Sequence, residues 1–293
     1  MGRNRGLGYA DAMRSQRPSV TIAERLRSFL PGSSLHIPPG RVAVLRLYGP
    51  ILGAGRTSEW IELARRLRES KRVPAVVLDV DSPGGSAAGS DDLYLALARL
   101  AAKKPLVAAI RGTGASGAYL AAIAARRIVA NPTALIGSIG VIAAGPRLTR
   151  LLDRLGVTVA EHRAGELKGM GMPWREESKA EAEKEQALID GIYASFVSRV
   201  ARARNLSEER VRELATGEVW LGTQAMDLGL VDEIGDLERA IEIAAEIAKV
   251  PAKAAPIRIP RPFMSRLIDR FASRLAMSFA DEIETRLWDR YRN

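Results

Sequence analysis

Residues 112–126 read GTGASGAYLAAIAAR, and small residues crowd the first half of this stretch. The apolar run 105–110 (PLVAAI) before it predicts a buried strand, whereas 119–125 continues as an apolar helix. Ser116 would therefore lie at a strand-to-helix turn. A helix N-terminus leaves backbone N–H groups free, so a hydroxyl there stands beside donors for an oxyanion, which is what acyl transfer needs. A plain helix cap explains the same serine, and both interpretations stay open on these residues alone.

Apolar runs and helical periods alternate on both sides of this stretch. Strands are predicted at 41–48, 74–80, 127–130 and 157–162, with a glycine-punctuated strand or loop at 133–142. Helices are predicted at 58–69, 91–100, 116–125, 148–155, 176–204 and 207–215, and segments 220–230 and 237–249 complete the body. This alternation predicts an α/β fold with repeated β-α units and a mostly parallel sheet.

Residue counts exclude several kinds of site. The 293 residues include no cysteine and only two histidines, His36 and His162. A disulfide framework, a thiolate metal site and a three-histidine site are therefore excluded, and we expect no metal and no cofactor. A Ser-His-Asp triad would depend on one of the two histidines, and His162 falls in a predicted strand.

Basic residues are concentrated at the two ends of the chain, which has a net charge of +10. Such a balance indicates an anionic partner, either a membrane surface or a nucleic acid, or simply a solvated basic surface. The ends lack aromatic interleaving and base-reading motifs, so we expect no nucleic-acid partner. No apolar run approaches the ~20 residues needed to span a bilayer, and no signal-peptide core is seen. We expect a cytoplasmic protein.

Four segments are expected along the chain. A basic, poorly ordered arm covers 1–39, the α/β body 40–250, and a proline-containing linker 251–262. An amphipathic helix follows at 263–293, with an arginine-rich opposite face in its first half. This pattern is typical of a helix that lies on a membrane, packs on a partner subunit or docks on its own domain. We expect peripheral contact with the inner face of a membrane, or with a partner copy, through this helix.

Four short motifs carry the chemistry: DSPGG at 81–85, GASGAY at 114–119, IGSIGV at 136–141 and RAGELK at 163–168. Each is weak alone. In this order and spacing they resemble the signal peptide peptidase A family of serine peptidases, over residues 41–249. The resemblance implies the repeated β-β-α superhelix of the Clp-protease/crotonase type. It also implies a homo-oligomeric ring, as in the short form of the family. Ala118 and Asp81 depart from the glycine and asparagine that are usual in the family, and its N-terminal membrane span is not seen.

The resemblance assigns a role to each motif. Ser116 resembles the nucleophile and Lys168 the general base, while Ser138 falls where the family has a hydroxyl that orients the lysine amine. The N–H groups of Gly85 and Gly117 resemble the oxyanion hole. Three further positions resemble substrate-binding residues: Gly84, which also supports its turn, Ile139 and Gly140.

Elementary chemistry agrees with a Ser-Lys pair. A neutral lysine amine can take the proton of a serine hydroxyl. The pKa of a free lysine is ~10.4, so burial must lower it. Glu166 would raise the pKa of Lys168 if it faced the amine, so we expect its side chain to point away.

The expected function is a serine endopeptidase that cleaves short apolar peptides, such as signal-peptide remnants or membrane-protein fragments. Two alternatives stay open. A crotonase-type enzyme on acyl-CoA thioesters shares the two-amide oxyanion hole but needs an acid/base carboxylate, for which Asp81, Asp91 and Asp92 are the nearby residues. A catalytically inert, membrane-associated scaffold explains the basic ends, but not the joint presence of the serine, the lysine and both turns.

Overall fold

The computed structural model describes residues 37–257. The expected C-terminal helix 263–293 and residues 1–36 of the expected N-terminal arm lie outside this range. The described strands are β1 (Val42–Tyr48), β2 (Ala75–Ser82), β3 (Leu106–Ala115), β4 (Arg127–Ala130), β5 (Leu135–Gly137), β6 (Val219–Leu221), β7 (Glu233–Ile234) and β8 (Ala254–Pro256). The described helices are α2 (Gly53–Glu69), α3 (Ala87–Ala101), α4 (Gly117–Ala122), α5 (Thr149–Arg154), α6 (Lys179–Arg204), α7 (Glu208–Leu214), α8 (Gly222–Asp227) and α9 (Leu237–Ala248).

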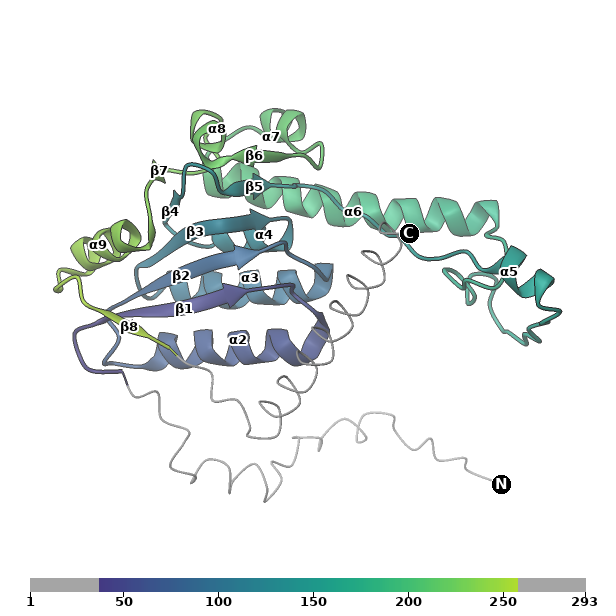
Figure 1. Cartoon of the computed structure of the whole chain (residues 1–293), viewed down its shortest axis with the longest axis horizontal. Helices are drawn as coiled ribbons and strands as arrows, with labels where there is room; N and C mark the ends of the chain where they lie inside the picture. Colours follow the sequence, from purple (N-terminus) through teal and green to yellow (C-terminus); the bar gives the residue numbers. More distant parts are fainter. Residues whose placement is uncertain (1–36, 258–293) are drawn as a thin grey trace, which may run out of the picture. The chain divides into compact units, whose positions relative to one another are not determined.

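Within the described residues these strands form one sheet in the order β6-β5-β3-β2-β1-β8, with β4 beside β3 and β7 beside β4. Every pairing is parallel except that of β5 with β6. Figure 1 shows α2 below the central strands and α9 at the left of the sheet, where α9 packs on residues of β1, β2, β3 and β4. The mixed α/β fold with a mostly parallel sheet agrees with the prediction.

The core explains why the central strands read as unbroken apolar runs. A strand that is covered on both faces has no side exposed to solvent, so its sequence does not alternate between apolar and polar residues. On the α9 side, alternate residues of four strands pack against one face of that helix. The members of this cluster include Val42, Val44, Ala75, Val77, Val107, Ala109, Val129, Ala240, Ile241 and Ala244.

Strand β3 runs further than the apolar pattern indicates. Its first half pairs with β4, and residues 113–115 then pair with β5. The small residues before Ser116 thus stay extended, because β5 gives their backbone groups a partner. The end of β3 delivers Ser116 to the edge where α4 begins.

Two segments differ from the sequence expectations. The predicted strand at 157–162 is wrong: these residues are exposed and irregular, because they lie outside the sheet with no strand alongside. Within the expected linker 251–262, β8 adds to the sheet edge, where Ala254 pairs with Val42. A short edge strand tolerates the prolines around it, because a proline there need not donate to a neighbour.

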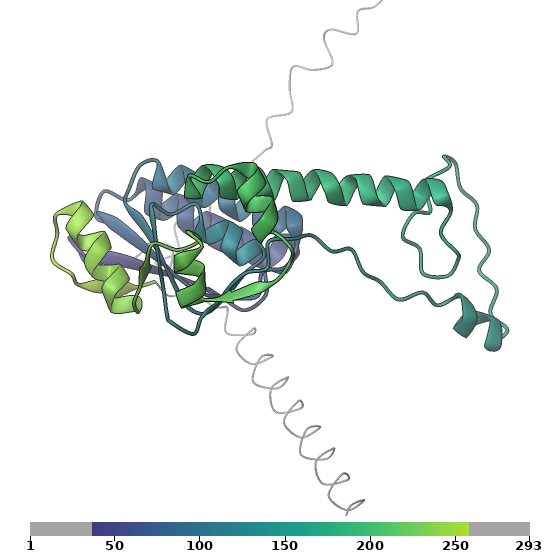
Figure 2. The same cartoon turned by 90° about the horizontal axis from the view of Figure 1, so that it is seen from above.

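Residues 143–186, here called the arm, leave the body and return as the first part of α6. Figures 1 and 2 both show α5 beyond the N-terminal end of α6, away from the sheet. The second half of α6 is anchored in the body, where Phe196, Val197 and Val200 are buried. Within residues 37–257, no helix combines the length and the apolarity needed to cross a membrane.

Candidate active site

Ser116 lies at a strained turn between β3 and α4. Its backbone has φ 52° and ψ −125°, which a residue with a side chain rarely adopts. Such a conformation costs about 1–3 kcal/mol and persists where its surroundings impose it. Here the Ser116 N–H donates to Gly137 O at 2.8 Å, and Ser116 O accepts from Leu120 N at 3.0 Å. The Ser116 side chain makes no cap hydrogen bond, so it is not a plain helix cap.

The 81–85 turn lies directly against the Ser116 turn. A Cβ on Gly84 would lie 2.6 Å from Gly117 N and 2.7 Å from Ala115 O, and one on Gly85 would overlap Ile51 O. Only glycine allows this approach. Within residues 37–257, the N–H groups of Gly85 and Gly117 have no hydrogen-bond acceptor. Both belong to residues that line one groove with Ser116, as an oxyanion hole requires.

The third motif reaches the same groove only in part. Ser138 adopts φ 46°, and its N–H donates to Glu218 O at 2.7 Å. Ser138 and Gly140 line the groove beside Ser116. The side chain of Ile139 is instead fully buried, so it is not a groove contact, and Gly84 supports the turn from behind.

The groove has a volume of about 1160 Å³ and runs between α3, α4, α6 and the chain after β5. Its apolar lining comes from Leu120, Val141, Ile142, Leu188, Ile192 and Phe196. Contributions from α6 were not predicted, although the late apolar positions of that helix could have indicated them. The lining suits an extended peptide with apolar side chains.

Lys168 lies apart from this groove. It is exposed on the arm and is not a lining residue. The pair Ser116–Lys168, expected to meet in one cavity, is therefore not brought together within this chain. His162 is also exposed on the arm and also lies outside the groove, so neither residue is in place to act on Ser116 of its own copy.

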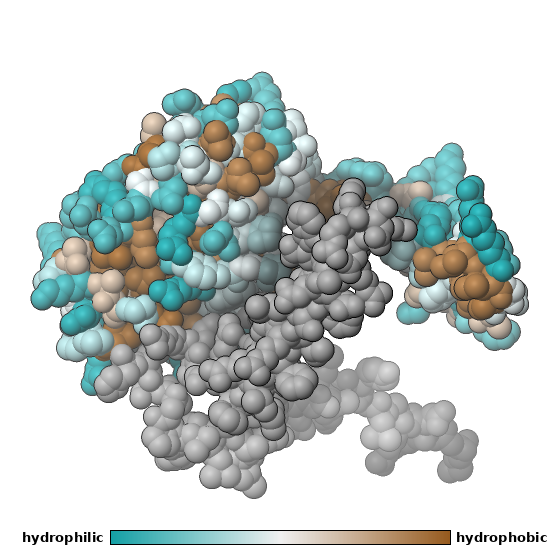
Figure 3. Space-filling view, in the orientation of Figure 1, coloured by the Kyte–Doolittle hydropathy of each residue, from teal (hydrophilic) through white to brown (hydrophobic). Residues whose placement is uncertain are grey.

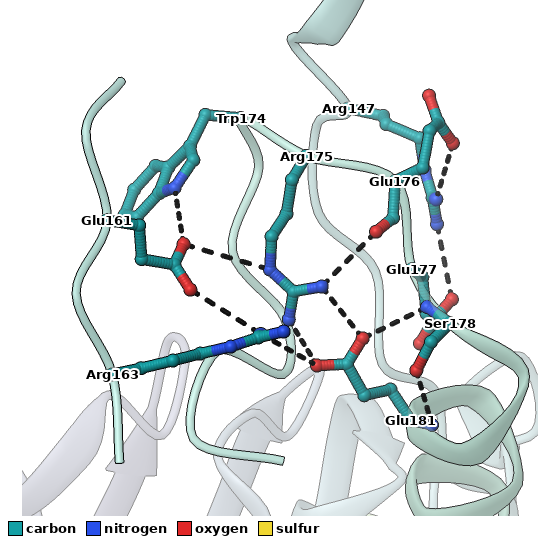
Figure 4. Close-up of polar contacts among 9 residues, drawn as sticks. All are labelled: Arg147, Glu161, Arg163, Trp174, Arg175, Glu176, Glu177, Ser178 and Glu181. Carbon is teal, nitrogen blue, oxygen red and sulfur yellow. Dashed lines mark hydrogen bonds and ion pairs between the residues drawn. The ribbon is translucent and has the colours of Figure 1, made fainter. Parts of the chain in front are cut away.

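An ionic cluster shapes the arm around the Lys168 segment (Figure 4). Arg175 binds both carboxylate oxygens of the buried Glu181, and its Nε lies 3.9 Å from Glu161 Oε2. A Cβ on Gly169 would lie 2.8 Å from Arg175 Nη2 and 3.0 Å from Glu161 Oε1. The cluster thus supports the residue next to Lys168. It was not predicted, although the S-x-x-E spacing of Ser178 and Glu181 is a readable capping box.

Arg175, through its hydrogen bond, lowers the pKa of Glu181 from 4.5 to about 2, with the Ser178 N–H assisting. A carboxyl with a lowered folded pKa stabilises the fold above its unfolded pKa and loses that contribution as the pH falls through the folded pKa. The contribution of the Arg175–Glu181 pair to the stability of the arm should therefore weaken as the pH falls from 4.5 to about 2.

Trp174 reports on this cluster, because its Nε1 donates to Glu161 Oε2 at 3.2 Å. We expect its fluorescence, taken as the difference from Trp174→Phe, to change over that pH range in wild type. In Glu181→Gln the change should already be present at neutral pH. Glu183→Gln is the matched control, because among residues 37–257 Glu183 pairs only with the exposed Lys179, at 3.7 Å. Identical pH curves for Glu181→Gln and wild type would contradict this role.

Gly117→Ala should lower the free energy of unfolding, because its methyl group would clash with a side chain that lines the groove. The new Cβ would overlap Ser90 Oγ and lie 2.7 Å from Ser90 Cβ, so rotating the Ser90 side chain does not relieve the clash. Overpacking of this kind costs about 1–3 kcal/mol of unfolding free energy. Urea unfolding measures the loss. Gly53→Ala is the control, since its Cβ would meet nothing within 4 Å; equal stability of the two variants would contradict the tight packing.

Two of the three carboxylates near the groove have a partner. Asp81 accepts from Thr113 N at 3.0 Å, and Asp91 forms an ion pair with Arg199. Asp92 is exposed at the groove edge. No group of three or more potential metal ligands gathers in the part of the chain that the structure describes.

Comparisons with known proteins identify the family of the chain. The sequence pattern of the family described as Peptidase family S49 matches residues 98–251. A Synechocystis protein named "Putative protease slr0021" is 38% identical over 230 residues, which cover 78% of this chain and 82% of that protein.

Two longer relatives carry peptidase names as well. "Serine protease SPPA, chloroplastic" from Arabidopsis thaliana is 35% identical over 231 residues, or 76% of this chain and 34% of that protein. "Protease 4" from Salmonella typhi is 34% identical over 218 residues, or 72% of this chain and 35% of that protein. The chain thus spans about a third of these two relatives. The matched residues show that the chain belongs to peptidase family S49, the signal peptide peptidase A family of serine peptidases.

Proposed function

We propose that this protein is a serine endopeptidase that cleaves short apolar peptides, such as signal-peptide remnants or fragments of membrane proteins, with Ser116 as nucleophile and Lys168 as general base. The observation that carries the proposal is the strained Ser116 turn, which lines an apolar groove beside two backbone N–H groups without acceptors. Strand-to-helix turns of this kind expose a nucleophilic serine in other hydrolases.

Lys168 reaches the nucleophile, we propose, from a second copy of the chain. In one copy Lys168 is exposed on the arm and does not line the groove. The arm also exposes several large apolar side chains, which Figure 3 shows gathered there. These are Leu151, Leu155, Val157, Val159 and Met172. An apolar patch of this kind marks a contact surface, and a homo-oligomeric ring would let the arm of each copy cover the groove of the next.

Burial of Lys168 in that contact between copies would favour its action as a general base. Removing water around Nζ would disfavour the ammonium form and favour the neutral amine that can accept a proton. The Ser138 hydroxyl, which lines the groove, would accept a hydrogen bond from the amine and orient it. The reaction would therefore depend on assembly, which brings the amine to the groove and removes water from it.

The proton passes from Ser116 through Lys168 to the leaving amine. Ser116 Oγ attacks the peptide carbonyl carbon while Lys168 Nζ takes the hydroxyl proton. The carbonyl oxygen becomes an oxyanion and accepts from the N–H groups of Gly85 and Gly117. Collapse breaks the C–N bond, and the leaving amine takes the proton from Lys168. Water then hydrolyses the acyl-enzyme by the same route.

The proposal includes three further parts: the repeated β-β-α superhelix of the Clp-protease/crotonase type, a cytoplasmic location, and peripheral membrane contact through residues 263–293. The membrane contact would bring the protein to apolar peptides that leave a bilayer.

A direct assay tests the proposal. The oligomeric protein is incubated with apolar peptides of about ten residues, and the products are identified by mass spectrometry. We expect cleavage at internal bonds. Turnover of an acyl-CoA thioester with every peptide intact would contradict the proposal and favour the crotonase alternative.

A further inference from the structure

Ser90, in the first turn of α3, carries a buried hydroxyl without a partner. The residue is 2% exposed, and Ser90 Oγ forms no hydrogen bond within the described residues. A serine inside a helix usually bonds its hydroxyl to the carbonyl four residues earlier. Here that carbonyl, Ser86 O, accepts the Ser90 N–H at 2.9 Å, and the hydroxyl makes no such bond. The side chain instead lines the groove with Ser116.

The Ser90 side chain lies against Gly117, one of the two residues of the proposed oxyanion hole. A Cβ on Gly117 would overlap Ser90 Oγ and would lie 3.6 Å from Gly85 N, so the hydroxyl lies close to Gly117 and in the neighbourhood of Gly85. Ser90, Gly85 and Gly117 are thus neighbours that line one groove with Ser116, and each carries a donor without an acceptor among the described residues.

Packing alone does not explain a serine at this position. Alanine would fill nearly the same volume without a polar atom. A buried hydroxyl with no partner lowers stability, because no hydrogen bond compensates for the loss of its water contacts. A group that lowers stability in this way is typical of sites where a ligand supplies the missing partner.

We propose that Ser90 is a further catalytic residue, whose hydroxyl donates a third hydrogen bond to the oxyanion formed at the scissile carbonyl. The inference rests on the proposed function of Ser116. Ser90 keeps its proton throughout: the C=O electron pair moves onto oxygen when Ser116 Oγ attacks, and Ser90 O–H only donates to the resulting negative charge. Its contribution is larger in the transition state than with bound substrate, because the charge is then greatest.

Ser90→Ala separates this role from a structural one. A hydrogen bond to a charged group contributes about 1.5–3 kcal/mol, so kcat should fall about 10- to 100-fold with KM little changed. A peptide aldehyde forms a tetrahedral adduct with an oxyanion, so its affinity should fall by the same factor. The affinity of an uncleaved substrate-like peptide should stay the same, and the melting temperature should stay the same or rise.

Ser198→Ala is the matched control, because Ser198 lies on α6 and does not line the groove. It should match wild type in every readout. Wild-type kcat and aldehyde affinity in Ser90→Ala would overturn the inference, and so would a parallel loss of aldehyde affinity, peptide affinity and melting temperature. Failure of the proposed function gives a different result, since Ser116→Ala would then still cleave the peptide.

Discussion

Ser116→Ala is expected to abolish peptide cleavage, with a loss of at least roughly 10⁴-fold in kcat. The oxyanion donors and the groove remain, so peptide binding should survive while the chemistry stops. Because the Ser116 side chain makes no cap hydrogen bond, the fold should not depend on it. Single-turnover kinetics on an apolar peptide, with binding measured separately by fluorescence anisotropy, tests both statements.

Ser116→Gly provides a sharper control for the fold. Glycine adopts φ 52° without penalty. The strain of about 1–3 kcal/mol should be relieved, partly offset by the greater chain entropy of glycine, for a net gain of about 1 kcal/mol. This variant should be inactive yet more stable than wild type. Substantial cleavage by either variant would contradict the role of Ser116 as nucleophile.

Lys168→Ala should cause a loss similar to that of Ser116→Ala, and the two variants should rescue each other. If the lysine comes from a neighbouring copy, a mixed ring holds sites with Ser116 from one variant and Lys168 from the other. Random mixing in equal amounts gives roughly one intact site in four, for subunits related by ring symmetry. Unfolding and co-refolding of the two variants, followed by the peptide assay, measures the recovery.

The control for this experiment is Lys179→Ala. Lys179 lies on the same arm and its side chain is 90% exposed; its one ion pair in the described part of the chain is with the exposed Glu183. It should retain wild-type activity, which would show that the arm tolerates loss of a positive charge. Zero recovery in the co-refolded mixture would contradict the supply of Lys168 from a second copy. Full activity of Lys168→Ala alone would show that another group is the base.

Local patterns predicted the part of the site that depends on neighbours in sequence. The Val-rich run before residue 81 and the apolar run before residue 112 became β2 and β3. Parallel strands end at one edge of a sheet, so the two glycine turns after them had to meet. The turn at 81–85 and Ser116 therefore followed from strand order and residue size.

Contacts between distant segments were harder to predict. Residues 157–162 alternate between apolar and polar side chains as a strand does. This pattern does not show whether another strand lies alongside to pair with them. Residues 254–256 contain a proline and look like linker, yet the open edge of β1 pairs with them. Ser90 shows the same limit, because only the fold reveals that its hydroxyl lacks a partner. The location of Lys168 depends on the arm, whose course no local pattern indicates.

Labelling with a fluorophosphonate tests the Ser116–Lys168 mechanism most directly, because the probe forms a covalent bond only with an activated serine. Intact mass counts the adducts, and peptide mapping locates them in wild type, Ser116→Ala and Lys168→Ala. We expect one adduct per chain at Ser116, at a rate that rises with pH as the lysine loses its proton. Labelling should be absent in Ser116→Ala and strongly slowed in Lys168→Ala. An adduct at another residue, or an unchanged rate in Lys168→Ala, would contradict the mechanism.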